Sequence, residues 1–510
     1  MHQPYYKDLL TNESDLPWVR LHGVKDYLDM VQILKKYPKI KNTFNVVPSL
    51  LEQVEDYCNN NIKDKFLELS YKPAKDLTLS DKQFILNNFF SINREKVVSL
   101  FPRYYELYLK KQANSDFKEQ DLLDLQVLFN LAWIDPSFRL GIQELKNVQY
   151  KGRFFNEQDK RIVLEAQKEI LKDIIPTYKD YLNSGKIELT VTPYYHPILP
   201  LLYNSNTAKE SNNKTILPKK VFSYPEDVKA QVFDAVKFFK DRFGLAPIGM
   251  WPSEQSVSER ILPDIMNSGI KWIVTDEAIL FNSLKKKKRD TELLYQPHSL
   301  KREEGELNIV FRDRNLSDMI GFVYHSWKAE PAVDDFMKHL SNISKAFKGK
   351  DILVTIAMDG ENAWEYYTND GHDFLNLLYQ RISDADDIIS TTVSEYLKDH
   401  PVKSKIKHLS PGSWIYANFN KWMNHPYKAK AWDWLIDARK ALELSEFKTK
   451  NEKSALAWKQ MYILEGSDWF WWYGEDPDGS FDRLYRLHLR NFYTLIKKDI
   501  PDYLDSPLTT

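Results

Sequence analysis

Two short apolar runs in the second half of the chain each end at a carboxylate. Residues 246–251 lead through Pro252 and Ser253 to Glu254, and residues 352–358 lead directly to Asp359. Each run has the length and apolar content of a buried strand, and the acid that follows marks its carboxyl end. We therefore predict two strands that present an acid at equivalent positions.

The same pattern alternates with helices along much of the chain. Helical patterns cover residues 24–37 and 225–243, and we predict strands at 39–47, which Pro48 ends, at 187–192, which Pro193 follows, and at 272–275 and 307–311. Residues 56–180 are mostly helical and charged, which is long for a simple crossover and predicts a helical insertion. Strands separated by helices favour an α/β fold with a parallel sheet or barrel. Catalytic residues of α/β barrels lie at the carboxyl ends of the strands.

The pattern changes after about residue 395, where strands give way to helices. Residues 428–444, 452–469 and 482–496 are rich in alanine, lysine and leucine and predict three helices. We therefore divide the chain into a barrel-type domain at 1–395, with its insertion around 56–180, and an α-helical domain at 396–510.

Composition excludes several classes of protein. The 71 basic and 72 acidic side chains nearly cancel, which argues against a nucleic-acid partner because such proteins carry a basic stripe. No stretch approaches 18 uncharged apolar residues, so we expect no membrane-spanning helix. The single cysteine, Cys58, excludes an internal disulfide and fits a reducing compartment, so we expect a cytoplasmic location. The oligomeric state does not follow from the sequence.

The chemistry suggested by the two acids is glycoside hydrolysis, which needs a nucleophile and a proton donor. The chain has 14 Trp, 29 Tyr and 27 Phe, and flat rings stack on sugars, although a large aromatic core explains them equally well. Each acid also has a simpler explanation. Glu254 could be an acid near a helix N-terminus, and Asp359 could form a turn before Gly360.

Five segments in order resemble the signature regions of glycoside hydrolase family 57 and span nearly the whole chain. The sequences Trp-Pro-Ser-Glu and Asp-Gly-Glu-Asn are most similar to the motifs of the α-amylase and amylopullulanase branch of this family. The resemblance implies an incomplete (β/α)7 barrel, completed at its active site by C-terminal helices. It also implies a retaining mechanism on α-glucans without an obligatory metal or other cofactor. The segments are His2-Gln3-Pro4, Gly185-Lys186-Ile187-Glu188, Gly249-Met250-Trp251-Pro252-Ser253-Glu254, Met358-Asp359-Gly360-Glu361-Asn362 and Gly466-Ser467-Asp468-Trp469-Phe470-Trp471-Trp472-Tyr473.

The resemblance implies roles for particular residues. Glu254 would be the nucleophile and Asp359 the acid/base, with Glu361 and Glu365 as nearby alternatives for the proton donor. The carboxyls of Glu254 and Asp359 should lie roughly 5–6 Å apart, as retention requires. We expect an α-glucan ligand to contact His2, Glu188, His196, Trp251, Trp364, Asp468 and Trp471.

These binding residues have structural alternatives. Glu188 could be a solvated strand-end charge and His196 a structural histidine. The three tryptophans are as suited to a core as to a sugar platform. Asp468 stands beside several aromatic residues, where an acid needs a partner or a ligand.

Two other classes of protein remain open. Histidines and carboxylates can bind zinc, as in metal-dependent sugar deacetylases and mannosidases on related barrels, but no H-E-x-x-H or H-x-x-x-H spacing is present. The other class is a non-catalytic protein that binds glucan. Within the favoured class, water as acceptor makes an amylase and a sugar hydroxyl makes a 4-α-glucanotransferase. Cleavage of α-1,6 bonds, as by an amylopullulanase, is also open.

The segment at His2 has the character of a loop that follows a strand, yet only Met1 precedes it. An edge strand without its neighbour exposes unpaired backbone groups. We therefore expect that the natural protein begins upstream, and that His2 is poorly anchored in this chain.

Overall fold

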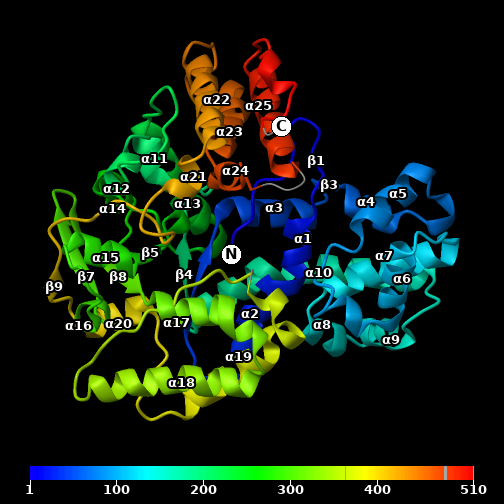
Figure 1. Cartoon of the computed structure of the whole chain (residues 1–510), viewed down its shortest axis with the longest axis horizontal. Helices are drawn as coiled ribbons and strands as arrows, with labels where there is room; N and C mark the ends of the chain where they lie inside the picture. Colours follow the sequence, from blue (N-terminus) through cyan, green and yellow to red (C-terminus); the bar gives the residue numbers. More distant parts are fainter. Residues whose placement is uncertain (362, 476–478, 509–510) are drawn as a thin grey trace.

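The computed structural model describes residues 1–361, 363–475 and 479–508 and shows an α/β protein (Figure 1). Asn362, in the fourth of the motifs, lies outside the described residues. The main sheet has seven strands in the order β2-β4-β5-β6-β8-β7-β9. The strands are β2 (Asn42–Val46), β4 (Ile187–Val191), β5 (Gly249–Met250), β6 (Trp272–Asp276), β8 (Gly305–Arg312), β7 (His298–Arg302) and β9 (Ser404–Lys405).

The strands from β2 to β8 run parallel, and every residue of β4 and β6 is buried. The hairpin of β7 with β8 is antiparallel and was not predicted. Gly249 is required in β5 because a Cβ there would lie 2.3 Å from the ring of Trp272. In the described part of the chain the sheet ends at β2 on one side and β9 on the other, so the barrel is incomplete, as predicted.

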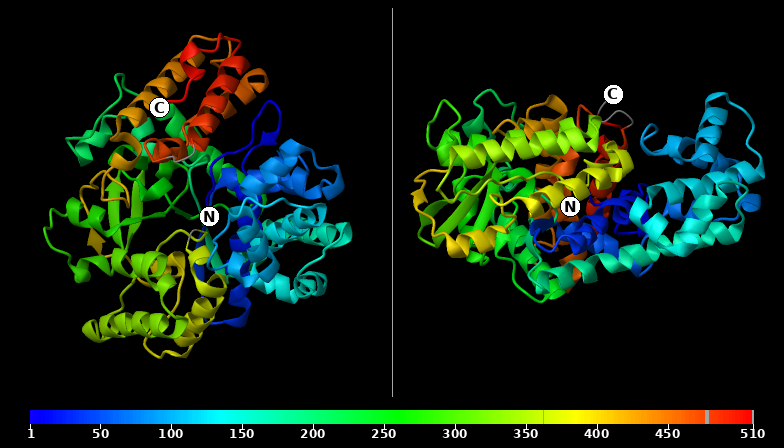
Figure 2. Two further views of the ribbon diagram at one scale, coloured as in Figure 1. Left: turned by 45° about the vertical axis from the view of Figure 1, so that its right-hand side comes forward. Right: turned by 90° about the horizontal axis from the view of Figure 1, so that it is seen from below.

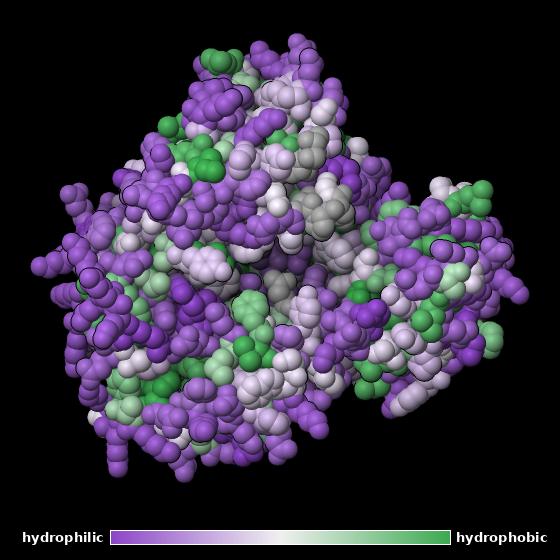
Figure 3. Space-filling view, viewed as in Figure 1, coloured by the Kyte–Doolittle hydropathy of each residue, from purple (hydrophilic) through white to green (hydrophobic). Residues whose placement is uncertain are grey.

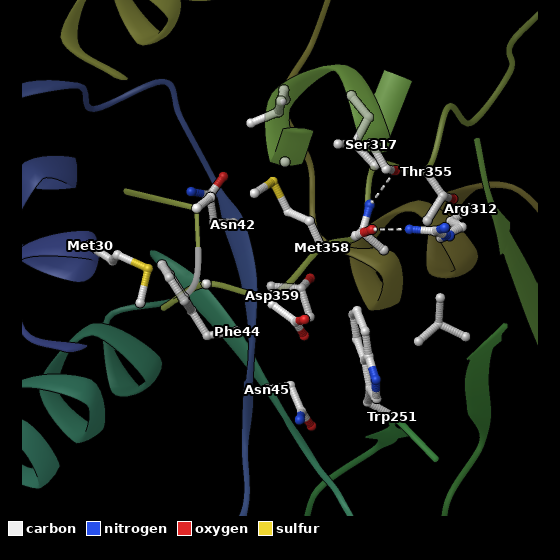
Figure 4. A pocket seen from close by; sticks show the side chains of 18 of the residues that line it. Met30, Asn42, Phe44, Asn45, Trp251, Arg312, Ser317, Thr355, Met358 and Asp359 are labelled. Atoms are coloured by element: carbon white, nitrogen blue, oxygen red, sulfur yellow. Dashed lines mark hydrogen bonds between the residues drawn. The ribbon is translucent and has the colours of Figure 1, made fainter. Parts of the chain in front are cut away.

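The segment at 352–358 is not the regular strand that its apolar run predicted. It is extended, but its only bridge pairs Thr355 with Arg312 of β8. Side chains replace the missing ladder. The amide of Ala357 donates to Oγ of Ser317 at 3.1 Å, and the carbonyl of Ala357 accepts from Nη1 of Arg312 at 3.2 Å (Figure 4). The segment still brings Asp359 to the carboxyl ends of the strands.

A helical insertion lies between β2 and β4, close to the predicted range, and most of its helices form the lobe on the right in Figure 1. Its longest helix is α10, which returns the chain to β4. The helix is capped at its start by Asn156, whose side chain accepts hydrogen bonds from the amides of Gln158 and Asp159. The helices are α3 (Pro48–Cys58), α4 (Lys65–Tyr71), α5 (Leu79–Asn88), α6 (Pro102–Gln112), α7 (Glu119–Trp133), α8 (Pro136–Gly141), α9 (Gln143–Lys151) and α10 (Glu157–Asn183).

The predicted helices after residue 395 form a bundle beside the barrel, drawn in orange and red in Figures 1 and 2. The single helix expected at 452–469 is broken at Gly466, so that α24 begins a new direction. A Cβ at Gly466 would lie 3.0 Å from the carbonyl oxygen of Tyr195, so the break allows close backbone contact. The helices are α22 (Pro426–Glu443), α23 (Ala455–Leu464), α24 (Ser467–Trp472) and α25 (Ser480–Leu495).

Nothing among the described helices has both the length and the apolar content needed to cross a membrane.

Candidate active site

A large cavity of ≈ 3470 Å³ opens between the barrel and the C-terminal helices. Its walls include Phe44 and Asn45 of β2, Trp251 after β5, and Trp471 of α24. Figure 3 shows the hollow near the centre of the face. Pockets for small ligands usually measure roughly 300–1,000 Å³, so this cavity has room for a chain-like ligand.

Glu254 lines this cavity from a tight turn directly after β5. Its backbone has a φ of 56°, in the left-handed region that a non-glycine residue adopts at a cost of about 1–3 kcal/mol. The indole N–H of Trp414 donates to Oε2 of Glu254 at 2.7 Å, and the amide of Trp414 donates to the carbonyl of Glu254 at 3.2 Å. Strain and two fixed contacts therefore hold the carboxyl in one orientation.

Asp359 lies across the cavity, at the end of the extended segment 352–358. Its side chain is exposed, and Figure 4 shows it directed into the space between Asn45 and Trp251. The structure thus brings both predicted acids to one cavity from two separate parts of the barrel.

The two acids interact electrostatically. The pKa of the Glu254 carboxyl is raised to about 8, first by burial and then by the negative charge of Asp359. The charge of His2 and the hydrogen bond from Trp414 oppose this rise. Interacting acids lose their protons in two separate steps, so the charge of one carboxyl favours a state in which the pair shares one proton. Glycoside hydrolysis needs this combination of one carboxylate and one carboxylic acid.

The raised pKa of Glu254 predicts an effect on stability. Because the unfolded residue ionises near pH 4.5 and the folded one near pH 8, the folded state loses stability as the pH rises between these values. We expect Glu254→Gln, which removes this ionisation, to raise the Tm by on the order of a few degrees at pH 8. The gain should disappear near pH 4.5. Calorimetry of both proteins at the two pH values measures it, and an equal difference at both would show an unperturbed carboxyl.

His2 is well anchored, contrary to our expectation from its position near the start of the chain. Its amide donates to Oε1 of Glu361 at 2.9 Å, and its Nε2 lies 3.1 Å from Oδ2 of Asp468. Its ring stacks on that of His196 with centroids 3.6 Å apart. Three segments far apart in the sequence therefore fix His2 in the cavity wall.

His196 joins the barrel to α24. Its Nδ1 lies 2.8 Å from Oγ of Ser467, and the amide of Ser467 donates to the carbonyl of His196 at 3.1 Å. Burial and the charge of His2 lower the pKa of His196. For His2, burial lowers the pKa, but the charge of Asp468 and its hydrogen bond outweigh burial and the pKa is raised. The stacked pair therefore consists of a neutral His196 and a His2 that readily takes up a proton.

His2, His196 and Asp468 each offer one ligand atom, and these atoms lie within 4.8 Å of one another. The trio could hold a metal ion or the hydroxyl groups of a sugar. Ser467 uses Nδ1 of His196 and leaves the other ring nitrogen of His196 for such a contact.

The predicted tryptophans line the cavity to different extents. Trp251 is half-buried and meets Trp414 edge to face, with centroids 5.5 Å apart. Trp364 is only 6% exposed and packs on Tyr367, so it belongs mainly to the core. The ring of Trp471 is half-buried and has Lys421 Nζ 4.2 Å from its centroid. Trp251 and Trp471 are therefore better suited than Trp364 to face a ligand.

The structure does not bring Glu188 to the site, so the expected binding role for this residue is corrected. Glu188 is the second residue of β4, away from its carboxyl end, and does not line the cavity. Its carboxylate accepts from Nε1 of Trp272 at 3.1 Å and from the amide of Ser394 at 3.1 Å. These contacts satisfy a buried charge and link β4 to β6 and to α20 (Val393–Asp399).

Two residues that shape the site were missed in the sequence. Ser467 adjoins Asp468 in the last motif, and that adjacency was the available signal. Trp414 stands in an irregular loop after Pro411, Gly412 and Ser413, where no periodicity points to a site. The available signal for Trp414 was an aromatic residue that directly follows three turn-forming residues.

An incomplete (β/α)7 barrel with Glu254 directly after β5 and Asp359 at the end of the extended segment 352–358, both facing one aromatic cavity, has the two carboxyls that a glycoside hydrolase needs. The chain belongs to glycosyl hydrolase family 57, whose family model matches residues 1–408.

Relatives and solved structures agree with this assignment. An alpha-amylase of Pyrococcus horikoshii is 21% identical over 368 residues, which cover 70% of this chain and 49% of that protein. The chain thus spans about half the length of this curated relative. The crystal structure of a branching enzyme from Thermococcus kodakaraensis superposes with a TM-score of 0.62 at 16% identity, over 97% of this chain and 88% of that one. An alpha-amylase of Thermotoga maritima gives 0.60 at 12% identity, over 97% and 91%. These two structures support the fold.

Proposed function

We propose that this protein is a retaining enzyme that acts on α-1,4-glucosidic bonds of starch- or glycogen-type glucans. The observation that carries the proposal is the pair of acids in one cavity, where burial and then the charge of Asp359 raise the pKa of Glu254. In this proposal Glu254 is the nucleophile and Asp359 is the acid/base. His2, His196, Trp251, Trp471 and Asp468 contact the sugar.

The reaction has two displacements. Glu254 attacks the anomeric carbon while Asp359 transfers its proton to the leaving glycosidic oxygen, and a β-linked glycosyl-enzyme forms. Asp359, now a carboxylate, takes a proton from the incoming acceptor, whose oxygen displaces Glu254. The two inversions give net retention of the α configuration.

The shared proton must reside on Asp359 at the start of this cycle. Burial alone would favour it on Glu254. Two contacts favour the ionised form of Glu254: the indole N–H of Trp414, which can only donate, and the positive charge of His2. Asp359 is exposed, so its side chain can reach a substrate oxygen in the cavity.

An α-glucan is the favoured substrate because the related proteins are named as alpha-amylases and as a branching enzyme. The volume of the cavity and the half-buried rings of Trp251 and Trp471 suit several sugar units.

Product analysis from maltoheptaose tests the reaction. We expect retention, seen by NMR as release of the α-anomer before mutarotation, and shorter oligosaccharides as products. Oligosaccharides longer than the substrate would identify transfer, as in a 4-α-glucanotransferase, and products branched through α-1,6 bonds would identify a branching enzyme. Pullulan as substrate tests the amylopullulanase alternative. Initial release of the β-anomer, or no reaction on any of these glucans, would contradict the proposed function.

A further inference from the structure

A second cluster of metal-ligating side chains lies outside the cavity. It combines Asp29 of α2 (Asp29–Gln32), Asp135 at the start of α8, and His372 at the start of α19 (His372–Asp384). One ligand atom from each lies within 4.8 Å of the other two. Nε2 of His372 is 2.8 Å from Oδ2 of Asp135. None of the three lines the candidate active site.

Asp29 gives an independent indication of a ligand. Its residue surface is only 4% exposed, and its Oδ1 has no hydrogen-bond partner in the described part of the chain. A buried carboxylate oxygen without a partner is costly, so native proteins pair such atoms with a donor or an ion. The unpartnered oxygen of Asp29, close to Asp135 and His372, therefore marks a place for a bound cation.

The groups around the cluster are mainly acidic. Asp26 and Asp370 face it along with Asp29 and Asp135. Lys25 forms an ion pair with Asp370, and Arg139 also contributes a positive charge near Asp135. Lys36, which is exposed, places a third positive charge near His372. Four buried carboxyls therefore outnumber these three cations, and His22 and His372 supply further charge only when protonated. A bound divalent cation would add the positive charge that the cluster lacks.

We propose that Asp29, Asp135 and His372 bind a divalent transition-metal ion of the zinc type. One imidazole nitrogen with two carboxylate oxygens suits zinc, whereas magnesium and calcium prefer oxygen ligands alone. Asp135 is already oriented for this role. The amide of Ser137 donates to its Oδ1 at 2.7 Å, which leaves Oδ2 directed at His372.

The ion would fasten a segment that belongs to the catalytic region. His372 follows directly on the stretch that begins at Asp359, and three consecutive residues before it have φ values in the left-handed region: 52° at Asn369, 55° at Asp370 and 77° at Gly371. Such a backbone persists only where its surroundings hold it. The metal would join this stretch to the helical insertion and to α2.

Zinc binding to the whole chain tests the proposal. Protein stripped with a chelator and dialysed against zinc should hold one ion by mass spectrometry of the metal, and its Tm should rise with zinc concentration. X-ray absorption should show nitrogen and oxygen ligands at about 2.0–2.2 Å. Magnesium and calcium at the same concentration should give no comparable rise.

Variants identify the site. Asp29→Asn and His372→Gln should each lose the zinc-dependent rise in Tm. Their zinc affinity should fall by more than the ~10–100-fold that loss of an outer-shell partner costs. Asn preserves the shape of Asp29 without its charge, so the metal-free variant should keep the fold, checked by circular dichroism.

Two controls separate this site from others. Asp468→Asn removes a ligand of the other candidate trio, and His339→Gln disrupts the half-exposed pair of His339 with Asp335, 3.6 Å apart. Both should bind zinc as the unaltered protein does. The proposal is overturned if the unaltered protein binds no zinc, if Asp29→Asn and His372→Gln retain it, or if only Asp468→Asn loses it. These readouts do not depend on glucan turnover.

Discussion

Replacement of Glu254 by glutamine should lower glucan turnover by ~10⁴-fold or more, as expected for loss of a nucleophile that acts together with its partner acid. An amide cannot form the glycosyl-enzyme ester at a useful rate. Glutamine keeps the shape of the side chain and can still accept the hydrogen bond from Trp414. We therefore expect the fold and glucan binding to be retained, as measured by calorimetry and by titration with maltoheptaose.

Asp359→Asn should be equally inactive on glucan but should differ in one diagnostic reaction. A glycosyl fluoride has a leaving group that needs no protonation, so Asp359→Asn should still form the glycosyl-enzyme with this donor, whereas Glu254→Gln should not. Intact-protein mass spectrometry detects the adduct. If only Glu254→Gln forms an adduct, the two roles are exchanged, as burial of Glu254 alone would suggest.

Glu365→Gln is the matched control, because Glu365 also lines the cavity and was an alternative proton donor. We expect it to keep most of its activity. Glu361 is less suitable as a control, since its Oε1 accepts from the amide of His2 and its loss would disturb the site.

The fold was predictable where burial was uniform. β6 is buried throughout and begins with the apolar run Trp272-Ile273-Val274, which predicts a strand buried on both faces. β4 is equally buried, although Glu188 and Thr190 interrupt its apolar positions. The apolar run before Asp359 was equally clear, yet side chains of Arg312 and Ser317 replace its ladder. These contacts join residues that are 45 and 40 positions apart in the sequence, so the residues next to the apolar run give no sign of them.

The motifs singled out Glu254, Asp359, His2 and Asp468, and these four residues line one cavity, while their roles stay predictions. Glu188 shows the limit, since a carboxylate in a motif can equally serve a buried structural network. The break at Gly466 depends on a contact with Tyr195, far away in sequence, and could not be seen in the helical periodicity.

Asp468→Asn should reduce kcat by ~10²–10³-fold, the usual loss when one preorganised charged group is removed from an active site. Asp468 accounts for the largest upward effect on the pKa of His2, and the charge of His2 in turn favours the ionised form of Glu254. Without Asp468, the pKa of His2 falls. His2 then loses its proton at a lower pH than before, and its support of the Glu254 carboxylate is lost as the pH rises. The charge of Asp468 itself raises the pKa of Glu254, but this direct effect is smaller than that of His2.

The variant should therefore lose activity on the alkaline side at a lower pH than the unaltered enzyme, a shift that pH profiles of kcat/KM measure. Asp505→Asn is the control, because Asp505 forms an exposed ion pair with Arg490 at 2.6 Å in the same C-terminal region. Exposed pairs contribute little, about 0–1 kcal/mol, so this variant should keep both its rate and its pH profile. A uniform loss across the pH range in Asp468→Asn would point to sugar binding alone. Unchanged activity would show that α24 does not take part in the site.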